Sequence, residues 1–275
     1  MGAPEYTLAC RGVVMTELSG RFMDVGSADQ VAVLFLHAFP YQRAMWAPQV
    51  DALAGQARVL ALDVRGHTPG SAAPTAYMLE HLVDDTLALL DARGVERCVL
   101  CGLSMGGYVA LRLTQRAPQR VRALLLSNTQ AASDSNQAKE ARAEGLRTLW
   151  SRGLTAFAEA QLARQLAPTT AARSPALVER LRAQILALTP EAVTASMVAI
   201  ATRPDLSAFV REIAVPTAVA VGAHDAITPP AVATELARAI PGASLHVLEG
   251  AGHLSNVEAA PEFNAVLGDL IAKVR

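Results

Sequence analysis

Gly102-Leu103-Ser104-Met105-Gly106-Gly107 is the stretch that decides the fold of this 275-residue chain. It follows the apolar run Cys98 to Cys101, which predicts a strand, and it precedes a stretch of helical period from Gly107 to Ala117. A serine on a sharp strand-to-helix turn needs glycines two positions away on either side, because side chains there would crowd the turn. The G-x-S-x-G pattern in this setting predicts that Ser104 is a nucleophile, although the same letters elsewhere indicate only a turn serine.

Short aliphatic and β-branched runs alternate with amphipathic stretches along the rest of the chain. Leu79 to Ala92 is one such stretch, with Leu82, Leu89 and Leu90 on one stripe of a predicted helix. Continuous apolar runs separated by helices are typical of a mostly parallel sheet that is buried on both faces. The sequence therefore predicts an α/β fold whose other strands are Val31 to Leu36, Val59 to Leu62, Val121 to Leu126, Thr217 to Val221 and Leu245 to Leu248.

The strand pattern stops between residues 129 and 206, where the sequence becomes rich in Ala, Leu, Arg and Glu. Glycine and proline divide this segment into three or four predicted helices, with breaks at Gly153, Pro168, Pro175 and Pro190. Because the strand pattern resumes at Thr217, we expect an α/β core of residues 1–128 and 207–275 and an inserted helical cap of residues 129–206. Trp150 in this cap is expected either to line an apolar pocket or to take part in ordinary packing.

A serine hydroxyl is a weak nucleophile, so Ser104 requires a base within hydrogen-bond reach and a third group that orients the base. Asp225 follows the predicted strand Thr217 to Val221, and His253 follows the next strand. The carboxyl ends of parallel strands meet at one edge of a sheet, so all three side chains are expected there. The chain order Ser, acid, His predicts Ser104 as nucleophile, His253 as base and Asp225 as the residue that orients the base.

Other residues compete for the roles of acid and base. Asn128 follows the strand that ends at Leu126, which is a second position for the acid, but an amide lacks the negative charge that stabilises an imidazolium. Taken alone, Asp225 would be interpreted as a capped loop aspartate and His253 as a loop histidine, whereas the ordered set favours the triad. Four other histidines either neighbour the acid, lie within a strand or lack a strand-end position: His67, His81, His224 and His246.

The tetrahedral intermediate of acyl transfer also requires N–H donors for its oxyanion. In a nucleophile turn of this kind the residue after the serine supplies one donor, which predicts the backbone N–H of Met105. The second donor is expected in the loop His37-Ala38-Phe39-Pro40, after an earlier strand, and the Phe39 N–H is the candidate. The side chains of Phe39 and Met105 are equally compatible with lining the pocket.

The balance of charge excludes several kinds of partner. The chain has 24 Lys and Arg against 25 Asp and Glu, a net charge of -1, and neither sign forms a block, so we expect no nucleic-acid or anionic-lipid partner. No apolar run approaches the length of a membrane helix and the N-terminus has no signal pattern, which predicts a cytoplasmic protein without a membrane partner. The expected partner is a small-molecule ester or lactone, and the oligomeric state stays open.

The three cysteines are an odd number and resemble no disulfide framework. Cys98 and Cys101 match a C-x-x-C pattern, but in a strand positions three apart point to opposite faces, so both are expected to be buried thiols and not a redox pair. Cys10 is likewise expected to be reduced. The sequence contains no H-E-x-x-H pair and no close His/Cys/carboxylate cluster, so no metal is expected, and the triad needs no cofactor.

From about Val31 to the C-terminus the chain resembles the α/β-hydrolase superfamily. Besides the serine turn, the landmarks are His37-Ala38-Phe39-Pro40 with Trp46, Asp63-Val64-Arg65-Gly66-His67, Gly222-Ala223-His224-Asp225 and Gly252-His253. Within the superfamily, the chain is similar to 3-oxoadipate enol-lactonases and related carboxylesterases. This similarity is carried by the serine turn, by Gly222 to Asp225 and by His253-Leu254-Ser255-Asn256-Val257-Glu258. The resemblance implies an α/β-hydrolase fold and serine-dependent hydrolysis of small carboxylic esters through an acyl-enzyme.

The resemblance also leaves alternatives. One is an enol-lactone hydrolase acting on an acidic lactone, which would need a cation at the pocket; Arg43 and Arg203 are candidates, although surface arginines are common. Others are an acyltransferase, a perhydrolase or a slow-turnover ligand sensor on the same fold. Perhydrolases that resemble this chain usually carry Gly where it has Tyr108. Haloalkane dehalogenases and epoxide hydrolases place a carboxylate at the turn, where this chain has Ser104.

Overall fold

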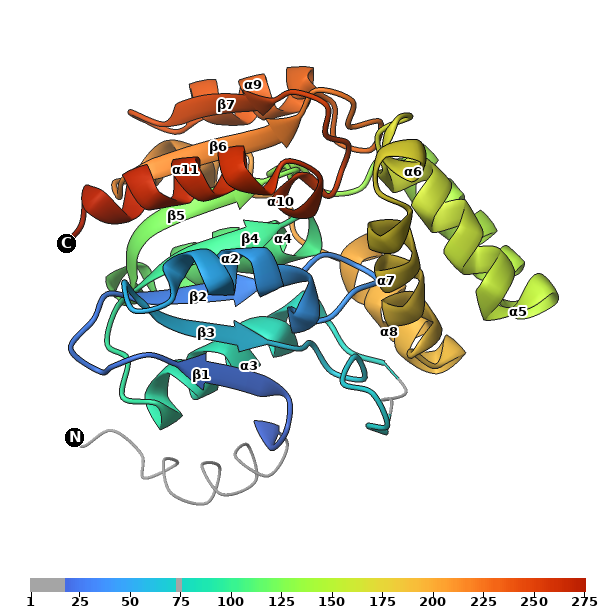
Figure 1. Cartoon of the computed structure of the whole chain (residues 1–275), viewed down its shortest axis with the longest axis horizontal. Coiled ribbons are helices and arrows are strands. Elements are labelled where there is room, and N and C mark those ends of the chain that lie inside the picture. The colour runs from blue at the N-terminus through green and yellow to red at the C-terminus, as the bar shows by residue number, and fades with distance from the viewer. Residues whose placement is uncertain (1–17, 73–75) are drawn as a thin grey trace.

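The computed structural model describes residues 18–72 and 76–275, so the start of the predicted core, including Cys10, lies outside the described residues. One sheet contains the strands β1 (Phe22–Val25), β2 (Ala32–Leu36), β3 (Arg58–Leu62), β4 (Cys98–Leu103), β5 (Val121–Ser127), β6 (Thr217–Gly222) and β7 (Ser244–Leu248). Their spatial order is β1-β3-β2-β4-β5-β6-β7 (Figure 1). β1 pairs antiparallel with β3, and every other neighbouring pair is parallel.

The parallel strands lie where the apolar runs predict them, whereas β1 has no such signal. β1 is a short edge strand whose residues are half-buried or exposed, so it needs no continuous apolar run. Asp24 in β1 forms ion pairs with Arg58 and Arg93. A charged residue on an edge strand is common in proteins, because it discourages pairing with other chains.

Helices cover both faces of the sheet. In Figure 1 one face carries α2 (Ala47–Leu53), α10 (Ser255–Glu258) and α11 (Ala260–Ala272), and the other carries α3 (Leu79–Ala92), α4 (Met105–Arg116) and α9 (Pro230–Ala239). α3 has the bounds that its leucine stripe predicts, and its side chains Leu82, Leu89 and Leu90 are buried. Short 3-10 helices lie at η1 (Arg43–Trp46), η2 (Pro118–Arg120) and η3 (Phe209–Glu212).

Four consecutive helices separate β5 from β6 in the sequence. They are α5 (Asn136–Gln165), α6 (Thr170–Arg173), α7 (Pro175–Leu186) and α8 (Pro190–Ala201). Gly153 within α5 has a φ of 82°, and the helix kinks there. Figure 1 shows α5 to α8 beside the carboxyl ends of the parallel strands, so these helices adjoin the sheet edge at which the strands end.

Among the described residues, no single helix has both the length and the apolar composition needed to cross a membrane. α7 and α8 meet that requirement only when taken together, and the pair is bent by 93°.

Trp46 connects the sheet to the helices on one face. Its ring is fully buried and stacks on Phe35 of β2, with ring centroids 4.7 Å apart. The ring of Phe263 in α11 lies 6.0 Å from it on another side. Aromatic side chains bury large apolar areas, so this cluster contributes to the core beneath the edge at which the strands end.

Candidate active site

Ser104 lies between β4 and α4 in a backbone conformation that is rare for a residue with a side chain. Its φ is 53° and its ψ is -112°. Such conformations cost about 1–3 kcal/mol and cluster at functional sites. The Ser104 N–H donates to the carbonyl of Ser127 at 2.9 Å, and the Ser104 carbonyl accepts from Thr129 Oγ1 at 2.9 Å. These contacts hold a strained serine at the carboxyl edge of the sheet, on the strand-to-helix turn where the sequence places it.

The glycines beside Ser104 are required by close approach of backbone segments. A Cβ at Gly106 would lie 1.9 Å from the carbonyl oxygen of Leu36 in β2. A Cβ at Gly102 would lie 2.4 Å from the carbonyl oxygen of Gly106. Neither backbone atom can give way without moving a strand or the start of α4, so both positions accept only glycine.

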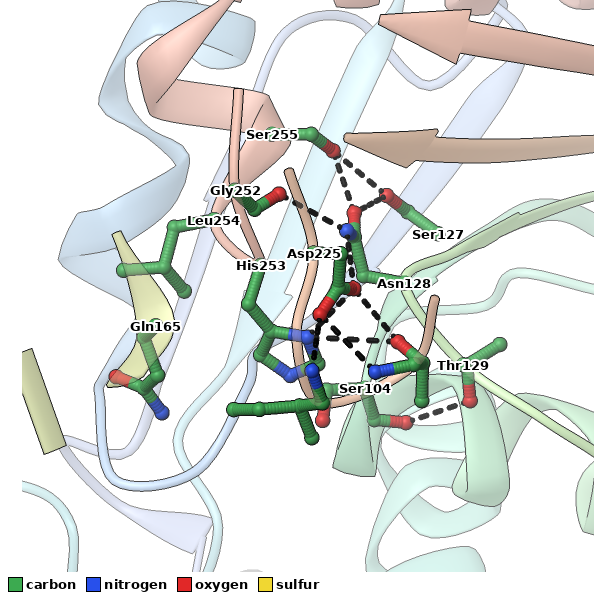
Figure 2. Close-up of polar contacts among 12 residues, drawn as sticks. Ser104, Ser127, Asn128, Thr129, Gln165, Asp225, Gly252, His253, Leu254 and Ser255 are labelled. Atoms are coloured by element: carbon green, nitrogen blue, oxygen red, sulfur yellow. Dashed lines mark hydrogen bonds and ion pairs between the residues drawn. The ribbon is translucent and has the colours of Figure 1, made fainter. Parts of the chain in front are cut away.

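His253 and Asp225 lie together at the same edge (Figure 2). His253 Nδ1 is 2.8 Å from Asp225 Oδ2, and both side chains are buried. Asp225 follows β6 and His253 follows β7, as the chain order predicts. A carboxylate at Nδ1 keeps the proton on that nitrogen and leaves Nε2 as the basic nitrogen of a neutral imidazole.

Asp225 accepts hydrogen bonds at both carboxylate oxygens. Oδ1 accepts from the backbone N–H groups of Ile227 and Thr228 at 2.8 and 3.0 Å, and Oδ2 accepts from Thr228 Oγ1 at 2.7 Å. Burial alone would raise the pKa of Asp225, but the charge and hydrogen bond of His253, together with hydrogen bonds from Asn128 and Thr228, outweigh it and lower the pKa to about 2. The acid therefore stays ionised beside the imidazole at neutral pH.

Ser104 and His253 line one cleft. Among the described residues no hydrogen bond joins Ser104 Oγ to His253. In ligand-free sites such hydrogen bonds are often long and tighten only when substrate binds. The structure thus brings Ser104 and His253 to one cleft, and the hydrogen bond from His253 to the buried Asp225 is already formed.

Asn128 follows β5 and contacts the acid instead of replacing it. Its Nδ2 donates to Asp225 Oδ2 at 2.8 Å and to the carbonyl of Gly252 at 3.2 Å (Figure 2). Its Oδ1 accepts from the hydroxyls of Ser127 and Ser255. Asn128 also has a positive φ of 48°, a conformation that asparagine tolerates better than most residues. Both ends of the amide are used, so it fixes the carboxylate relative to the His253 segment.

The two predicted oxyanion donors are the backbone N–H groups of Phe39 and Met105. Within the described residues neither the Phe39 N–H nor the Met105 N–H donates a hydrogen bond. Met105 is the first residue of α4, where the helix leaves its N–H groups free and favours negative charge. Phe39 lines the cleft together with Ser104.

His37 orients the peptide that carries the Phe39 N–H. His37 Nε2 accepts from the Val64 N–H at 3.0 Å, so the ring proton is on Nδ1 and is donated to the Ala38 carbonyl at 2.9 Å. In a trans peptide the carbonyl and the next N–H point in opposite directions, so holding Ala38 O directs the Phe39 N–H away from His37. Burial lowers the pKa of His37 to about 4, which keeps this ring neutral.

The cleft has a volume of about 590 Å³ and lies between the sheet edge and helices α5 and α8. Phe157, Met197 and Ile200 contribute apolar surface from these helices. Trp150 is not part of the lining. Its side chain is 58% exposed and donates through Nε1 to Thr194 Oγ1 at 3.2 Å, so both sequence-based expectations for Trp150 are wrong. Trp150 lies on the solvent side of α5.

The cations at the cleft differ from those that the sequence suggests. Arg43 forms an ion pair with Asp63, and Arg203 is buried against Asp134 with its guanidinium 4.1 Å from the centroid of the Tyr108 ring. Neither arginine lines the cleft. The arginines that do line it are Arg142, which is paired with Asp134, and Arg164, which has no hydrogen bond or ion pair among the described residues.

Two further residues that the sequence does not single out connect the helical segment to the site. Glu258 Oε1 accepts from the N–H groups of Gly252 and Leu254, which flank His253. Its Oε2 accepts from the N–H of Ala167 and the hydroxyl of Thr170. Gln165 at the end of α5 contacts the Phe39 carbonyl and the Tyr41 hydroxyl through its side chain and the His253 N–H through its carbonyl. Glu258 ends the motif His253 to Glu258, which is the only signal in the sequence that could have indicated its role.

The cysteines of β4 are confirmed as buried free thiols. Burial raises the pKa of Cys98 to about 12 and raises that of Cys101 well above its usual value. A thiol that stays protonated is a poor nucleophile and metal ligand, so no redox role is indicated. Within residues 18–72 and 76–275, no group of three or more His, Cys, Asp or Glu side chains is arranged to hold a metal ion.

Comparison with known proteins places this geometry in a family. Residues 31–260 match the family described as alpha/beta hydrolase fold. The chain belongs to the α/β-hydrolase fold family. This confirms the fold class and the resemblance inferred from the serine turn and the strand-end residues.

The relatives of this α/β hydrolase include enzymes that cleave esters and lactones. The chain is 32% identical to 3-oxoadipate enol-lactonase 2 of Acinetobacter baylyi, over 87% of this chain and 88% of that protein. A thermophilic esterase from Thermogutta terrifontis, solved with malate bound, superposes with a TM-score of 0.87 at 34% identity, covering 92% of this chain and 93% of the other. The enol-lactonase from Burkholderia xenovorans LB400 superposes with a TM-score of 0.84 at 33% identity, covering 91% and 95%.

Proposed function

We propose that this α/β hydrolase cleaves small carboxylic esters through an acyl-enzyme formed on Ser104. The observation that carries the proposal is a serine at positive φ that lines one cleft with His253, whose imidazole is hydrogen-bonded to the buried Asp225. The esterase and enol-lactonase relatives support the same class of reaction.

In the proposed reaction His253 Nε2 takes the proton of the Ser104 hydroxyl as Ser104 Oγ attacks the ester carbonyl. The oxyanion forms against the N–H groups of Phe39 and Met105, which have no other partner in the part of the chain that the structure describes. The imidazolium is stabilised by Asp225 and returns the proton to the departing alcohol. His253 then activates water, which attacks the acyl-enzyme and releases the acid.

We further propose that residues 129–206 act as a cap on a core formed by residues 1–128 and 207–275. Helices α5 and α8 in this segment supply the apolar side chains Phe157, Met197 and Ile200 to the cleft. In this proposal they hold the acyl or alkyl group of the substrate and limit its size. Water is excluded to the extent that substrate fills the space beneath them.

The test is turnover of p-nitrophenyl esters from acetate to octanoate, with the Ser104→Ala variant beside the wild type. Loss of turnover in the variant, with an optimum at one chain length, would support ester hydrolysis and give the size of the acyl site. A stoichiometric burst without turnover would instead favour a slow-turnover ligand sensor. Capture of the acyl group by an added alcohol, amine or peroxide in preference to water would favour an acyltransferase or perhydrolase.

A second candidate is hydrolysis of a lactone that carries a carboxylate, and the observation in its favour is Arg164. Arg164 lines the cleft with Ser104 and has no anionic partner among the described residues. The neighbouring Asp134 is already shared by Arg142 and Arg203, and Glu144, which also lines the cleft, is paired with Arg147. Both carboxylates therefore have cationic partners other than Arg164. A guanidinium in that position can bind a carboxylate with two parallel hydrogen bonds.

The two candidates differ in their response to Arg164→Met. The substrates are p-nitrophenyl butyrate and mono-p-nitrophenyl succinate, which share a leaving group and differ by a carboxylate, with an enol-lactone acid measured in parallel. If the second candidate is right, KM for the acidic substrates rises about 10-fold in Arg164→Met, since one charge-assisted contact is lost, and KM for the butyrate is unchanged. Arg152→Met is the matched control, because Arg152 is exposed on the same helix and does not line the cleft.

A further inference from the structure

Gln165 joins three segments that are far apart in the sequence. It is the last residue of α5, its side chain is 3% exposed, and it lines the cleft with Ser104 and His253 (Figure 2). A buried amide on a cap helix needs partners for its oxygen and its nitrogen. Both partners of Gln165 come from the loop that carries the proposed oxyanion donor.

The side-chain amide holds that loop on either side of Pro40. Gln165 Nε2 donates to the Phe39 carbonyl at 3.1 Å, and Gln165 Oε1 accepts from the Tyr41 hydroxyl. Burial raises the pKa of Tyr41, so the phenol remains a donor. Because the Phe39 carbonyl can only accept, the orientation of the amide is fixed by its two partners.

The backbone of Gln165 holds the segment that carries the base. Its carbonyl accepts from the His253 N–H at 2.6 Å. The two segments are so close that a Cβ at Gly252 would lie 2.6 Å from the same carbonyl oxygen. One residue therefore contacts the loop of Phe39 through its side chain and the segment of His253 through its main chain.

We propose that Gln165 is a positioning residue that sets the distance between the oxyanion donor on Phe39 and the base His253. The inference rests on the proposed function, since it assigns Gln165 to the alignment of the groups that act there. His37 fixes the peptide before Phe39 and Gln165 fixes the carbonyl after it, so removal of Gln165 frees one side of the donor. It also breaks the contact between this loop and the end of α5, so the base and the donor lose a common support.

The experiment uses three variants of the full chain and one control. Gln165→Leu removes both side-chain hydrogen bonds, Gln165→Glu keeps an acceptor for Tyr41 but offers no donor to the Phe39 carbonyl, and Tyr41→Phe removes only the phenol contact. The control is Gln184→Leu. In the wild type Gln184 Oε1 accepts from the Gln42 N–H at 3.2 Å, so this variant also removes a hydrogen bond between the helical segment and the core. Gln184 does not line the cleft. The measurements are kcat and KM for p-nitrophenyl butyrate and hydrogen–deuterium exchange of residues 37–42.

We expect kcat to fall about 10- to 100-fold in Gln165→Leu and Gln165→Glu, with KM within about 3-fold of the wild type, because a misaligned donor costs the transition state more than the bound substrate. The decrease in kcat is expected to be smaller in Tyr41→Phe than in either Gln165 variant. Exchange of residues 37–42 is expected to increase in both Gln165 variants. Gln184→Leu is expected to retain the kcat of the wild type and the exchange of residues 37–41, and only the Gln42 N–H, which loses its acceptor, is expected to exchange faster.

The inference is overturned if both Gln165 variants match Gln184→Leu in kcat, or if exchange of residues 37–42 is unchanged in Gln165→Leu. A change in KM alone would also contradict it, because that pattern belongs to a residue that binds substrate without aligning the site. Failure of the proposed function is seen separately, as turnover that does not depend on Ser104. In that case the exchange comparison alone decides whether Gln165 holds the loop.

Discussion

Asn128 Nδ2 donates to Asp225 Oδ2 at 2.8 Å, so the carboxylate that holds His253 is itself held by an amide from the neighbouring strand end. The variant Asn128→Asp keeps the size of the side chain and tolerates the positive φ, but it replaces the donor with a second carboxylate. Two carboxylates in contact cannot both ionise freely, so the shared pKa of the pair rises above the usual range of an aspartate.

Asn128→Asp is expected to change how the stability of the protein depends on pH. A folded-state pKa above the unfolded value means that the folded state binds more protons, so stability falls as pH rises through that pKa. We expect the free energy of unfolding of Asn128→Asp, relative to wild type, to be lower at pH 8 than at pH 5 and turnover at pH 8 to be reduced. Urea unfolding at the two pH values measures the effect. A constant difference between variant and wild type would show that the amide does not act on the charge of Asp225.

The strained backbone of Ser104 predicts a difference between two inactive variants. Glycine adopts a φ of 53° without steric cost, whereas alanine does not. We expect Ser104→Gly to be more stable than Ser104→Ala by about 1 kcal/mol, after allowance for the greater freedom of glycine in the unfolded chain. Thermal or urea unfolding of the two proteins gives the difference. Equal stability would mean that the serine turn stores no strain.

The close packing around Gly106 predicts that one added methyl group lowers the stability of the protein strongly. Gly106→Ala would place a Cβ 1.9 Å from Leu36 O, so β2 or the start of α4 must move. We expect a loss of about 3 kcal/mol or more in the free energy of unfolding, or failure to accumulate folded protein. Gly268→Ala in α11 is the control, because nothing lies within 4 Å of its Cβ position, and alanine is expected to be neutral or stabilising there. Similar stability of the two variants would contradict the packing described for the turn.

His67 predicts a loss of stability as the pH falls. His67 Nδ1 donates to the carbonyl of Tyr41, and Nε2 accepts from the hydroxyl of Ser196 in α8. Burial is the main cause that lowers the pKa of His67 to about 3, well below the unfolded value of about 6.5. Between these values the unfolded chain binds more protons, so the free energy of unfolding decreases as the pH falls from about 6.5 toward 3.

The variant His67→Gln isolates that contribution. It removes one titrating group, so its loss of stability between pH 7 and pH 5 is expected to be smaller than that of the wild type by about 1–2 kcal/mol. Urea unfolding at the two pH values is the measurement, and each protein serves as its own reference at pH 7. The same loss in both proteins would mean that His67 is protonated in the folded chain.

The parts of the site that the sequence predicts are those tied to strand ends. Ser104, Asp225 and His253 each follow a predicted strand, and parallel topology brings such positions to one edge. The strand pattern also places Phe39 and Met105, because each occupies a fixed position relative to a strand. Local periodicity and local spacing carry all of this information.

The contacts that support these residues depend on packing between distant segments. Asn128 and Asp225 are 97 positions apart, and Gln165 and Phe39 are 126 apart, so no local pattern links them. Local sequence patterns are equally unable to show which arginines line the cleft. Arg203 is as plausible a cleft cation as Arg164 in the sequence, and only the packing of the helices shows that Asp134 and Tyr108 enclose it.

The chain has two tryptophans, and they occupy opposite environments. Trp46 is fully enclosed beside β2, whereas Trp150 is 58% exposed on α5. Indole emission shifts to longer wavelength in water, so the blue part of the fluorescence spectrum reports the sheet and the red part reports the helical segment. A quencher that remains in water would remove the Trp150 signal first. Unfolding followed at two wavelengths would therefore show, without any added label, whether residues 129–206 come apart together with the sheet or before it.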